Sequence, residues 1–102
     1  MEKYFLHGKL TAKNGQSEQL VKILLKASEN MKATKGCRLY VISMCNDEKE
    51  NIWITEIWDS KYDHDNSLKN KKNKELIMQA IPLLESSPEK GQELKFLGGF
   101  GI

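Results

Sequence analysis

The residues best suited to acid–base chemistry are few, and His64 is the most promising of them. It is one of two histidines in the chain, and an imidazole exchanges protons near neutral pH without special tuning. His64 is therefore the candidate catalytic base. The alternative is a solvated or capping histidine, because the flanking carboxylates of Asp63 and Asp65 would favour its charged imidazolium form.

Two aromatic residues are candidates for substrate binding. Trp58 could position a flat aromatic substrate by stacking, with its indole N–H as a donor, and core packing is the alternative. Tyr40 offers a phenol that could donate to a substrate oxygen, and interface packing is the alternative. Glu56 lies on the same apolar side of its strand as Trp58. A carboxylate on an apolar face needs a polar partner, and Arg38 or a lysine is expected to supply it. A general-base role for Glu56 ranks second.

The remaining reactive side chains are predicted to be structural. His7 lies on the first strand, where it could line an interface or a pocket. Cys37 and Cys45 fall in one predicted strand, roughly 26 Å apart, whereas a disulfide needs Cα atoms closer than about 7 Å. With neither a CxxC spacing nor a histidine ligand pattern, both are expected to be free thiols in a reducing compartment.

Length and charge limit the classes of function. The chain has 102 residues, enough for one core, so residues 1–102 are predicted to form a single domain. The formal net charge is +2, and the lysine run at 69–74 lacks interleaved aromatic residues. This run is therefore expected to be a solvated loop or helix face, and neither nucleic acid nor a membrane is expected as a partner. The sequence has no apolar run of signal-peptide or membrane-span length, which favours the cytoplasm.

Hydrophobic periodicity predicts the elements that position these residues. Strands are expected at 3–11, 37–46, 52–58 and 93–100, a helix at 17–33, and a second helical region from Ser60 to Ile81, broken near 69–73 and ended by Pro82. The order β, α, β, β, α, β predicts an α+β fold, the ferredoxin-like split βαβ arrangement. Both helices would then cover one face of a four-stranded antiparallel sheet.

The predicted strands are apolar on both faces, which two helices cannot cover. In the third strand Trp53 and Ile57 oppose Ile52, Ile54 and Trp58. Each large apolar side chain contributes roughly 1.5–3 kcal/mol when fully buried. The sequence therefore predicts a homodimer in which two sheets pack face to face, with a cavity between sheet and helices for a small apolar or aromatic ligand.

Several motifs resemble the antibiotic biosynthesis monooxygenase family. They are the GC-x-x-Y of 36–40, the E-x-W-x-S of 56–60, the segments 64–68 and 82–84, and the closing 98–102, of which the last three are similar to its quinol monooxygenase branch. The resemblance implies a dimeric α+β barrel and, often, a small oxygenase that acts on phenols or quinols without metal, flavin or haem. The family also includes haem-degrading enzymes, which use a later helix histidine and a strand asparagine that this chain lacks.

These observations predict a cofactor-independent monooxygenase acting on a small aromatic or quinol. His64 would be the base, and Trp58 and Tyr40 would line the pocket. The alternative is a non-catalytic, dimeric ligand-binding or stress-associated protein that uses the same cavity.

Overall fold

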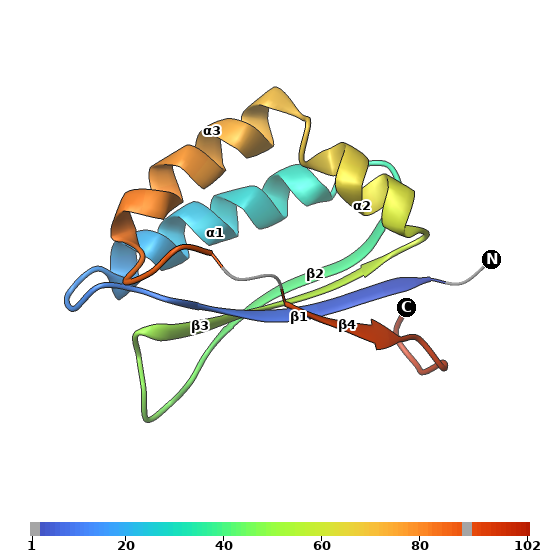
Figure 1. Ribbon diagram of the computed structural model, residues 1–102. Helices are drawn as coiled ribbons and strands as arrows, with labels where there is room; N and C mark the ends of the chain where they lie inside the picture. Colours follow the sequence, from blue (N-terminus) through green and yellow to red (C-terminus); the bar gives the residue numbers. More distant parts are fainter. Residues whose placement is uncertain (1–2, 89–90) are drawn as a thin grey trace.

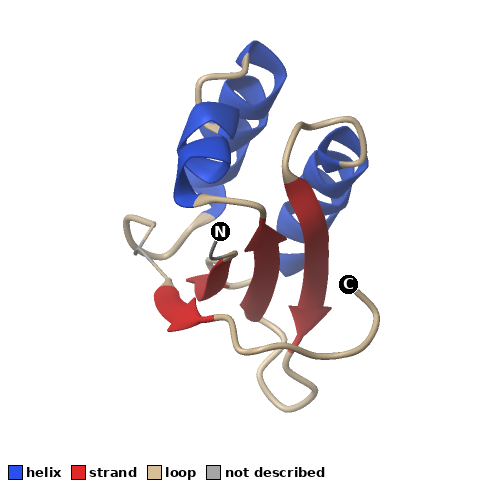
Figure 2. Cartoon of the chain, turned by 90° about the vertical axis from the view of Figure 1, so that its right-hand side faces the viewer, coloured by secondary structure: helices blue, strands red, loops and turns tan. Residues whose placement is uncertain are grey.

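Four strands and three α-helices make up the fold within residues 3–88 and 91–102, the parts of the chain that the computed structural model describes. In chain order they are β1 (Tyr4–Thr11), α1 (Ser17–Met31), β2 (Cys37–Met44), β3 (Asn51–Trp58), α2 (Lys61–Ser67), α3 (Lys71–Ala80), the short 3₁₀ helix η1 (Ile81–Leu83) and β4 (Gln92–Lys95). The sheet is antiparallel with strand order β2-β3-β1-β4. All three α-helices lie on one face of it (Figures 1 and 2). The predicted α+β, ferredoxin-like fold is confirmed.

Local capping residues explain where the second helical region starts and breaks. Ser60 caps α2, since its hydroxyl oxygen accepts a hydrogen bond from the Asp63 N–H at 3.1 Å. Asn70 caps α3 by accepting from the Lys72 N–H at 2.9 Å and from the Asn73 N–H. The break is therefore shorter than predicted, with α3 already begun at Lys71. Pro82 ends α3 as expected, and η1 continues the chain.

Gly36 joins the helix layer to the sheet in a way that needs glycine. Its φ of +84° is a conformation that other residues adopt only with strain. A Cβ atom at this position would also overlap the side chain of Asp63 at the start of α2. The turn into β2 can therefore lie against α2, the helix that carries His64.

The core lies between the helices and the covered face of the sheet. Its buried side chains come mainly from α1, α3 and β3, and include Leu20, Leu24, Ile52, Leu76 and Ala80. The apolar stripe of α1 predicted these contacts, since its buried residues recur at helical spacing. None of the described helices is long and apolar enough to cross a membrane.

The other face of the sheet carries apolar side chains that no described helix covers. We call it the open face, and in the register of the sheet it carries Phe5, Leu39, Val41, Trp53 and Leu94. Val41 and Leu94 are exposed, and the other three are partly buried. The two-faced apolar pattern predicted from the strands is therefore present.

The last strand is shorter than predicted. β4 spans only Gln92–Lys95, whereas the sequence pattern predicted a strand over 93–100. In the antiparallel register Lys95 pairs with Tyr4, the first residue of β1, so later residues have no strand to pair with. Gly98 and Gly99 then adopt φ values of +145° and +153°, which take the chain out of extended geometry and leave Leu97 and Phe100 exposed.

Candidate functional site

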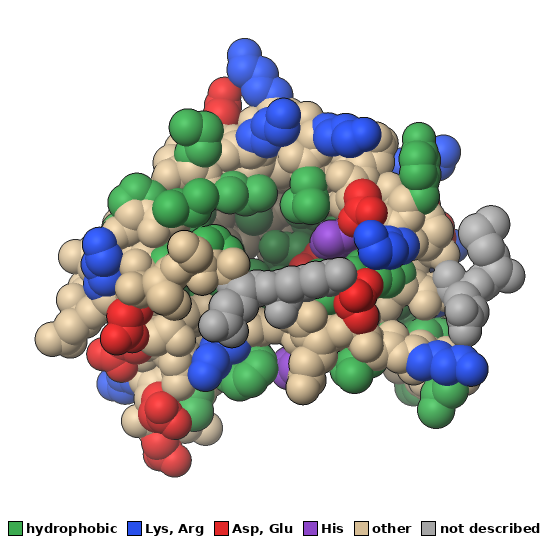
Figure 3. All heavy atoms as spheres, viewed as in Figure 1, with side chains coloured by type: hydrophobic (Ala, Val, Ile, Leu, Met, Phe, Trp, Pro, Cys, Tyr) green, Lys and Arg blue, Asp and Glu red, His purple; other side chains and the backbone are tan. Residues whose placement is uncertain are grey.

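A cavity of about 210 Å³ lies between the helix layer and the sheet. Its walls are mostly apolar and include Leu24, Met31, Ile54, Leu76 and Ile77. The polar lining residues are Tyr40, Glu56, His64, Ser67 and Asn73. Figure 3 shows this region as a hollow with hydrophobic side chains around it and a histidine close to acidic side chains. An apolar chamber with a few polar groups is the usual form of a small-molecule site.

Glu56 is the carboxyl group on the sheet side of this cavity. It lies in β3, opposite Leu6 of β1 and Tyr40 of β2, and its side chain is only 12% exposed. The indole Nε1–H of Trp58 donates a hydrogen bond to Oε1 at 3.0 Å. Burial raises the pKa of Glu56, while the bond from Trp58 and the proximity of His64 lower it to a smaller extent. The buried site therefore disfavours the charged carboxylate.

His64 faces Glu56 from α2. Its Nε2 lies 3.9 Å from Glu56 Oε1, and its side chain is also 12% exposed. Its Nδ1 lies 2.9 Å from Asp65 Oδ1, and the Lys61 Nζ donates to Asp65 Oδ2 at 2.8 Å. Lys61 and His64 lower the pKa of Asp65, so this carboxylate is ionised and can only accept. The arrangement assigns the ring proton to Nδ1 and leaves the Nε2 lone pair directed towards Glu56.

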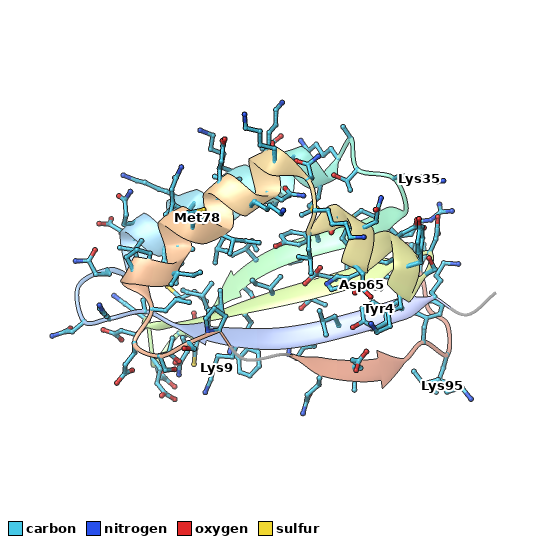
Figure 4. The ribbon with its side chains drawn as sticks, turned by 45° about the horizontal axis from the view of Figure 1, so that its top comes forward. Tyr4, Lys9, Lys35, Asp65, Met78 and Lys95 are labelled. Carbon is cyan, nitrogen blue, oxygen red and sulfur yellow. The ribbon has the colours of Figure 1, made fainter. Side chains whose placement is uncertain are left out.

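Two aromatic rings hold the imidazole in place. The centroid of the Tyr4 ring lies 5.1 Å from that of His64, in a tilted arrangement. Trp58 meets His64 edge to face, with 5.7 Å between centroids. Figure 4 shows Tyr4 at the start of β1, directly below Asp65 of α2. The imidazole therefore lies between the sheet and its own helix, with aromatic packing on two sides.

The predicted site residues lie close together but do not all reach the cavity. His64 and Tyr40 are on its wall, and burial raises the pKa of the Tyr40 phenol. Trp58 is fully buried and is not a lining residue. Its N–H, which was considered as a donor to the substrate, is bonded to Glu56. Trp58 thus lies behind the cavity wall and supports the two groups that form it.

The expected pairing of Glu56 with Arg38 is wrong. Arg38 Nε lies 2.6 Å from Asp59 Oδ1, on the surface. The β2–β3 register is irregular between Cys37 and Leu39, and this irregularity leaves Arg38 exposed while Tyr40 takes the position opposite Glu56. The partners of Glu56 are instead Trp58 and His64.

Sequence reasoning missed two polar residues of the cavity, Ser67 and Asn73. Both are buried, although Asn73 lies in the lysine-rich run that was predicted to be a solvated segment. The lysines of that run are exposed as expected. A signal was present, because Asn73 occupies the apolar stripe of α3 together with Leu76 and Ala80, at spacings of three and seven residues.

The other reactive side chains lie away from the polar end of the cavity or are inert. His7 is on the open face, with its Nδ1 3.0 Å from Thr55 Oγ1 and its ring stacked on Trp53. Cys37 and Cys45 are free thiols, and burial raises the pKa of Cys37 to about 11, which keeps it protonated. In residues 3–88 and 91–102, no group of three or more His, Cys, Asp or Glu side chains is arranged to hold a metal ion.

Comparison with known proteins places the chain in a family. The family model for antibiotic biosynthesis monooxygenases matches residues 3–77. A protein from Chloroflexus aurantiacus, provisionally described as an antibiotic biosynthesis monooxygenase, is 33% identical, with a TM-score of 0.87 over 98% of each chain. No curated protein matches the sequence significantly.

Two more distant structures share the fold. A protein from Nitrosomonas europaea with the same provisional description is 14% identical, with a TM-score of 0.89 over 97% of this chain and 94% of that one. A conserved protein from Methanosarcina mazei is 17% identical, with a TM-score of 0.81 over 87% and 88% of the two chains. From the family model and the Chloroflexus relative we conclude that the chain belongs to the antibiotic biosynthesis monooxygenase family.

Proposed function

We propose that this protein is a cofactor-independent monooxygenase of the quinol type, acting on a small aromatic or quinol substrate. The observation that carries the proposal is the buried pair formed by Glu56 and His64 at the wall of an apolar cavity. Family membership supports the oxygenase class. The cavity of about 210 Å³ is smaller than the roughly 300–1,000 Å³ of pockets for drug-sized ligands, which favours a substrate of one or two rings.

The pair would take up the proton that activates the substrate. A phenolic O–H that approaches His64 Nε2 loses its proton to that nitrogen, because Asp65 holds the ring in the tautomer with its lone pair on Nε2. Asp65 stabilises the resulting imidazolium at Nδ1, and the positive charge of the imidazolium in turn favours the ionised form of Glu56 on the Nε2 side. Glu56 itself is kept in place by Trp58. Tyr40 is the nearby donor for the substrate anion.

The oxygen chemistry then belongs mostly to the substrate. A quinol anion is electron-rich enough to pass an electron to O₂, and the radical pair combines into a ring hydroperoxide. Cleavage of its O–O bond leaves one oxygen atom on the ring and releases the other as water. The overall change, quinol plus O₂ to hydroxyquinone plus water, is balanced. The apolar walls keep bulk water from the reacting anion.

We further propose that the active form is a homodimer joined through the open face. The exposed Val41 and Leu94, with Phe5, Leu39 and Trp53 beside them, form an apolar surface of the kind that marks an interface. A second copy presents the same face, so a two-fold arrangement would cover both. The cavity lies on the opposite side of the sheet, so each subunit would keep its own site.

Oxygen uptake with a panel of hydroquinones tests the proposed activity. We expect the wild type to consume O₂ faster than the uncatalysed reaction, and His64→Ala to lower that rate by about 100-fold, a typical contribution of a general base. Glu56→Gln should lower the rate to a smaller extent, because it removes the carboxylate beside the imidazolium. Tyr62→Ala is the matched control, because Tyr62 is an exposed residue of the same helix as His64. It should leave the rate unchanged.

The outcomes separate enzyme from binding protein. Saturable quinol binding without oxygen uptake by the wild type would reject the oxygenase and favour a non-catalytic ligand-binding protein. Equal turnover by wild type and His64→Ala would reject His64 as the base and leave the activity standing.

A further inference from the structure

The two polar atoms of the Asn73 side-chain amide differ in their hydrogen bonding. Asn73 is 4% exposed, and its Nδ2 donates to the backbone oxygen of Ser67 at 2.9 Å. This bond assigns the orientation of the amide, because only the nitrogen can donate to a carbonyl. The Oδ1 atom is left without a hydrogen-bond partner among the described residues. It is the one buried side-chain polar atom of those residues in this condition.

Neighbouring polar groups do not satisfy this oxygen. The hydroxyl of Ser67, the residue whose backbone oxygen binds Asn73, donates instead to the backbone oxygen of His64 at 2.6 Å. Leaving a buried acceptor without a partner is destabilising, so a structural role alone would favour leucine on this apolar stripe. Asn73 is also a lining residue of the cavity that contains Glu56 and His64. An unpaired acceptor at the wall of a binding cavity indicates a ligand donor.

Resting on the function proposed above, we propose that Asn73 Oδ1 accepts a hydrogen bond from a second hydroxyl or N–H of the substrate. An amide oxygen can only accept, so the ligand group that meets it must carry a hydrogen. A substrate with one acidic hydroxyl at His64 and a second donor at Asn73 is a dihydroxy or aminohydroxy aromatic. In the hydroxyquinone product both of these groups have become carbonyls, so at these two ring positions the contact favours the reduced ring over the oxidised one.

Access to Oδ1 requires a small movement of the cavity wall. The atom exposes less than 1 Å² in the structure, so surrounding side chains cover it. Two lining residues near Asn73 in the chain, Leu68 and Ile77, are themselves exposed at the protein surface. They lack close packing on their outer side, so they are the side chains expected to shift when a ligand enters.

Anaerobic calorimetric titration with hydroquinone and 4-methylphenol tests the assignment without turnover. The two ligands have nearly the same shape, and the second replaces one hydroxyl with a methyl group. We expect the wild type to bind hydroquinone at least about fivefold more tightly, the worth of one hydrogen bond to a buried acceptor. Asn73→Leu should reverse this preference, because an apolar wall favours the methyl group.

Asn66→Leu is the matched control. Asn66 is an exposed asparagine of α2 that does not line the cavity, so the wild-type preference should persist. Comparing two ligands on the same variant makes the result independent of any loss of stability, and Asn73→Ala replaces Asn73→Leu if the leucine variant does not fold.

An unchanged preference in the Asn73 variant, or a wild type that binds 4-methylphenol as tightly as hydroquinone, would overturn the role of Asn73 and leave the oxygenase proposal intact. Failure of both phenols to bind would overturn the inference together with the proposed substrate class.

Discussion

At the scale of single residues, Glu56 is an ionisable group whose side chain is only 12% exposed. Burial raises its pKa, so the folded chain holds this proton more tightly than the unfolded chain does. Its contribution to stability is therefore full below the ordinary glutamate pKa and is lost as the pH rises through the folded pKa. Because Gln cannot ionise, the variant Glu56→Gln does not lose this stability as the pH rises.

We expect the free energy of unfolding of Glu56→Gln, relative to wild type, to increase from about pH 4 to about pH 8. The increase is limited to about 1.4 kcal/mol for each pH unit between the two pKa values. Urea unfolding at a series of pH values measures it. Asp65, whose pKa is lowered, loses its contribution at acid pH in both proteins and so drops out of the difference. Parallel curves for the two proteins would show that the carboxyl group is not desolvated.

Trp58 acts on the same carboxyl group through one hydrogen bond. Trp58→Phe keeps an aromatic ring beside His64 but removes the N–H that donates to Glu56 Oε1. That bond lowers the pKa of Glu56, so its loss should raise the pKa and move the acid limb of the pH–rate profile to higher pH. Trp53→Phe changes the other tryptophan, on the open face, and should leave the acid limb in place.

The candidate site could be predicted only in part from residue types. His64 could be proposed because the chain has only two histidines, and Tyr40 because it belongs to a recognisable motif; both line the cavity. The Glu56–His64 contact was not predicted, because it depends on how α2 lies over β3, and periodicity along each element does not fix that orientation. Asn73 was hidden among lysines, whose number suggested a solvated surface.

At the scale of elements, α2 is a short helix that relies on its cap. It spans Lys61–Ser67, and isolated helices of this length are not stable in water. The Ser60 hydroxyl accepts from the Asp63 N–H, so Ser60→Ala should cost about 1 kcal/mol of unfolding free energy. Because α2 carries His64, the same change should also slow oxygen uptake.

Ser17→Ala is the matched control for that prediction. Ser17 is the first residue of α1, whose N-terminus has no side-chain cap, so alanine there should cost little. Urea unfolding of the two variants compares them directly. Equal stability of Ser60→Ala and wild type would show that packing alone holds α2.

Element boundaries were predicted well where hydrophobic periodicity and capping residues agree. They were predicted poorly where pairing with a neighbouring strand sets the boundary. α1 and the first three strands lie close to their predicted ranges. The end of β4 is set by the start of β1, because Lys95 pairs with Tyr4 and nothing lies beyond it. An apolar pattern over 93–100 cannot carry that information, since it reports side-chain burial rather than the length of the neighbouring strand.

At the scale of the whole molecule, the open face is the surface on which the proposed dimer depends. Val41→Glu places a carboxylate on this face, midway along the edge strand β2, at a position that is exposed in the single chain, so the subunit should fold normally. In a dimer the same carboxylate would be buried without a partner, which costs several kcal/mol for each copy. We therefore expect the wild type to sediment as a dimer at micromolar concentration and Val41→Glu as a folded monomer.

Met78→Glu provides the control for the assembly. Met78 is an exposed apolar residue on α3, where Figure 4 shows it on the outer side of the helix layer. The same substitution there should leave the dimer intact. The melting temperature adds a second test, because a dimer gains stability with concentration and a monomer does not. A wild type that sediments as a monomer, with a melting temperature independent of concentration, would mean that the open face is stable in water, and the proposed dimer would be wrong.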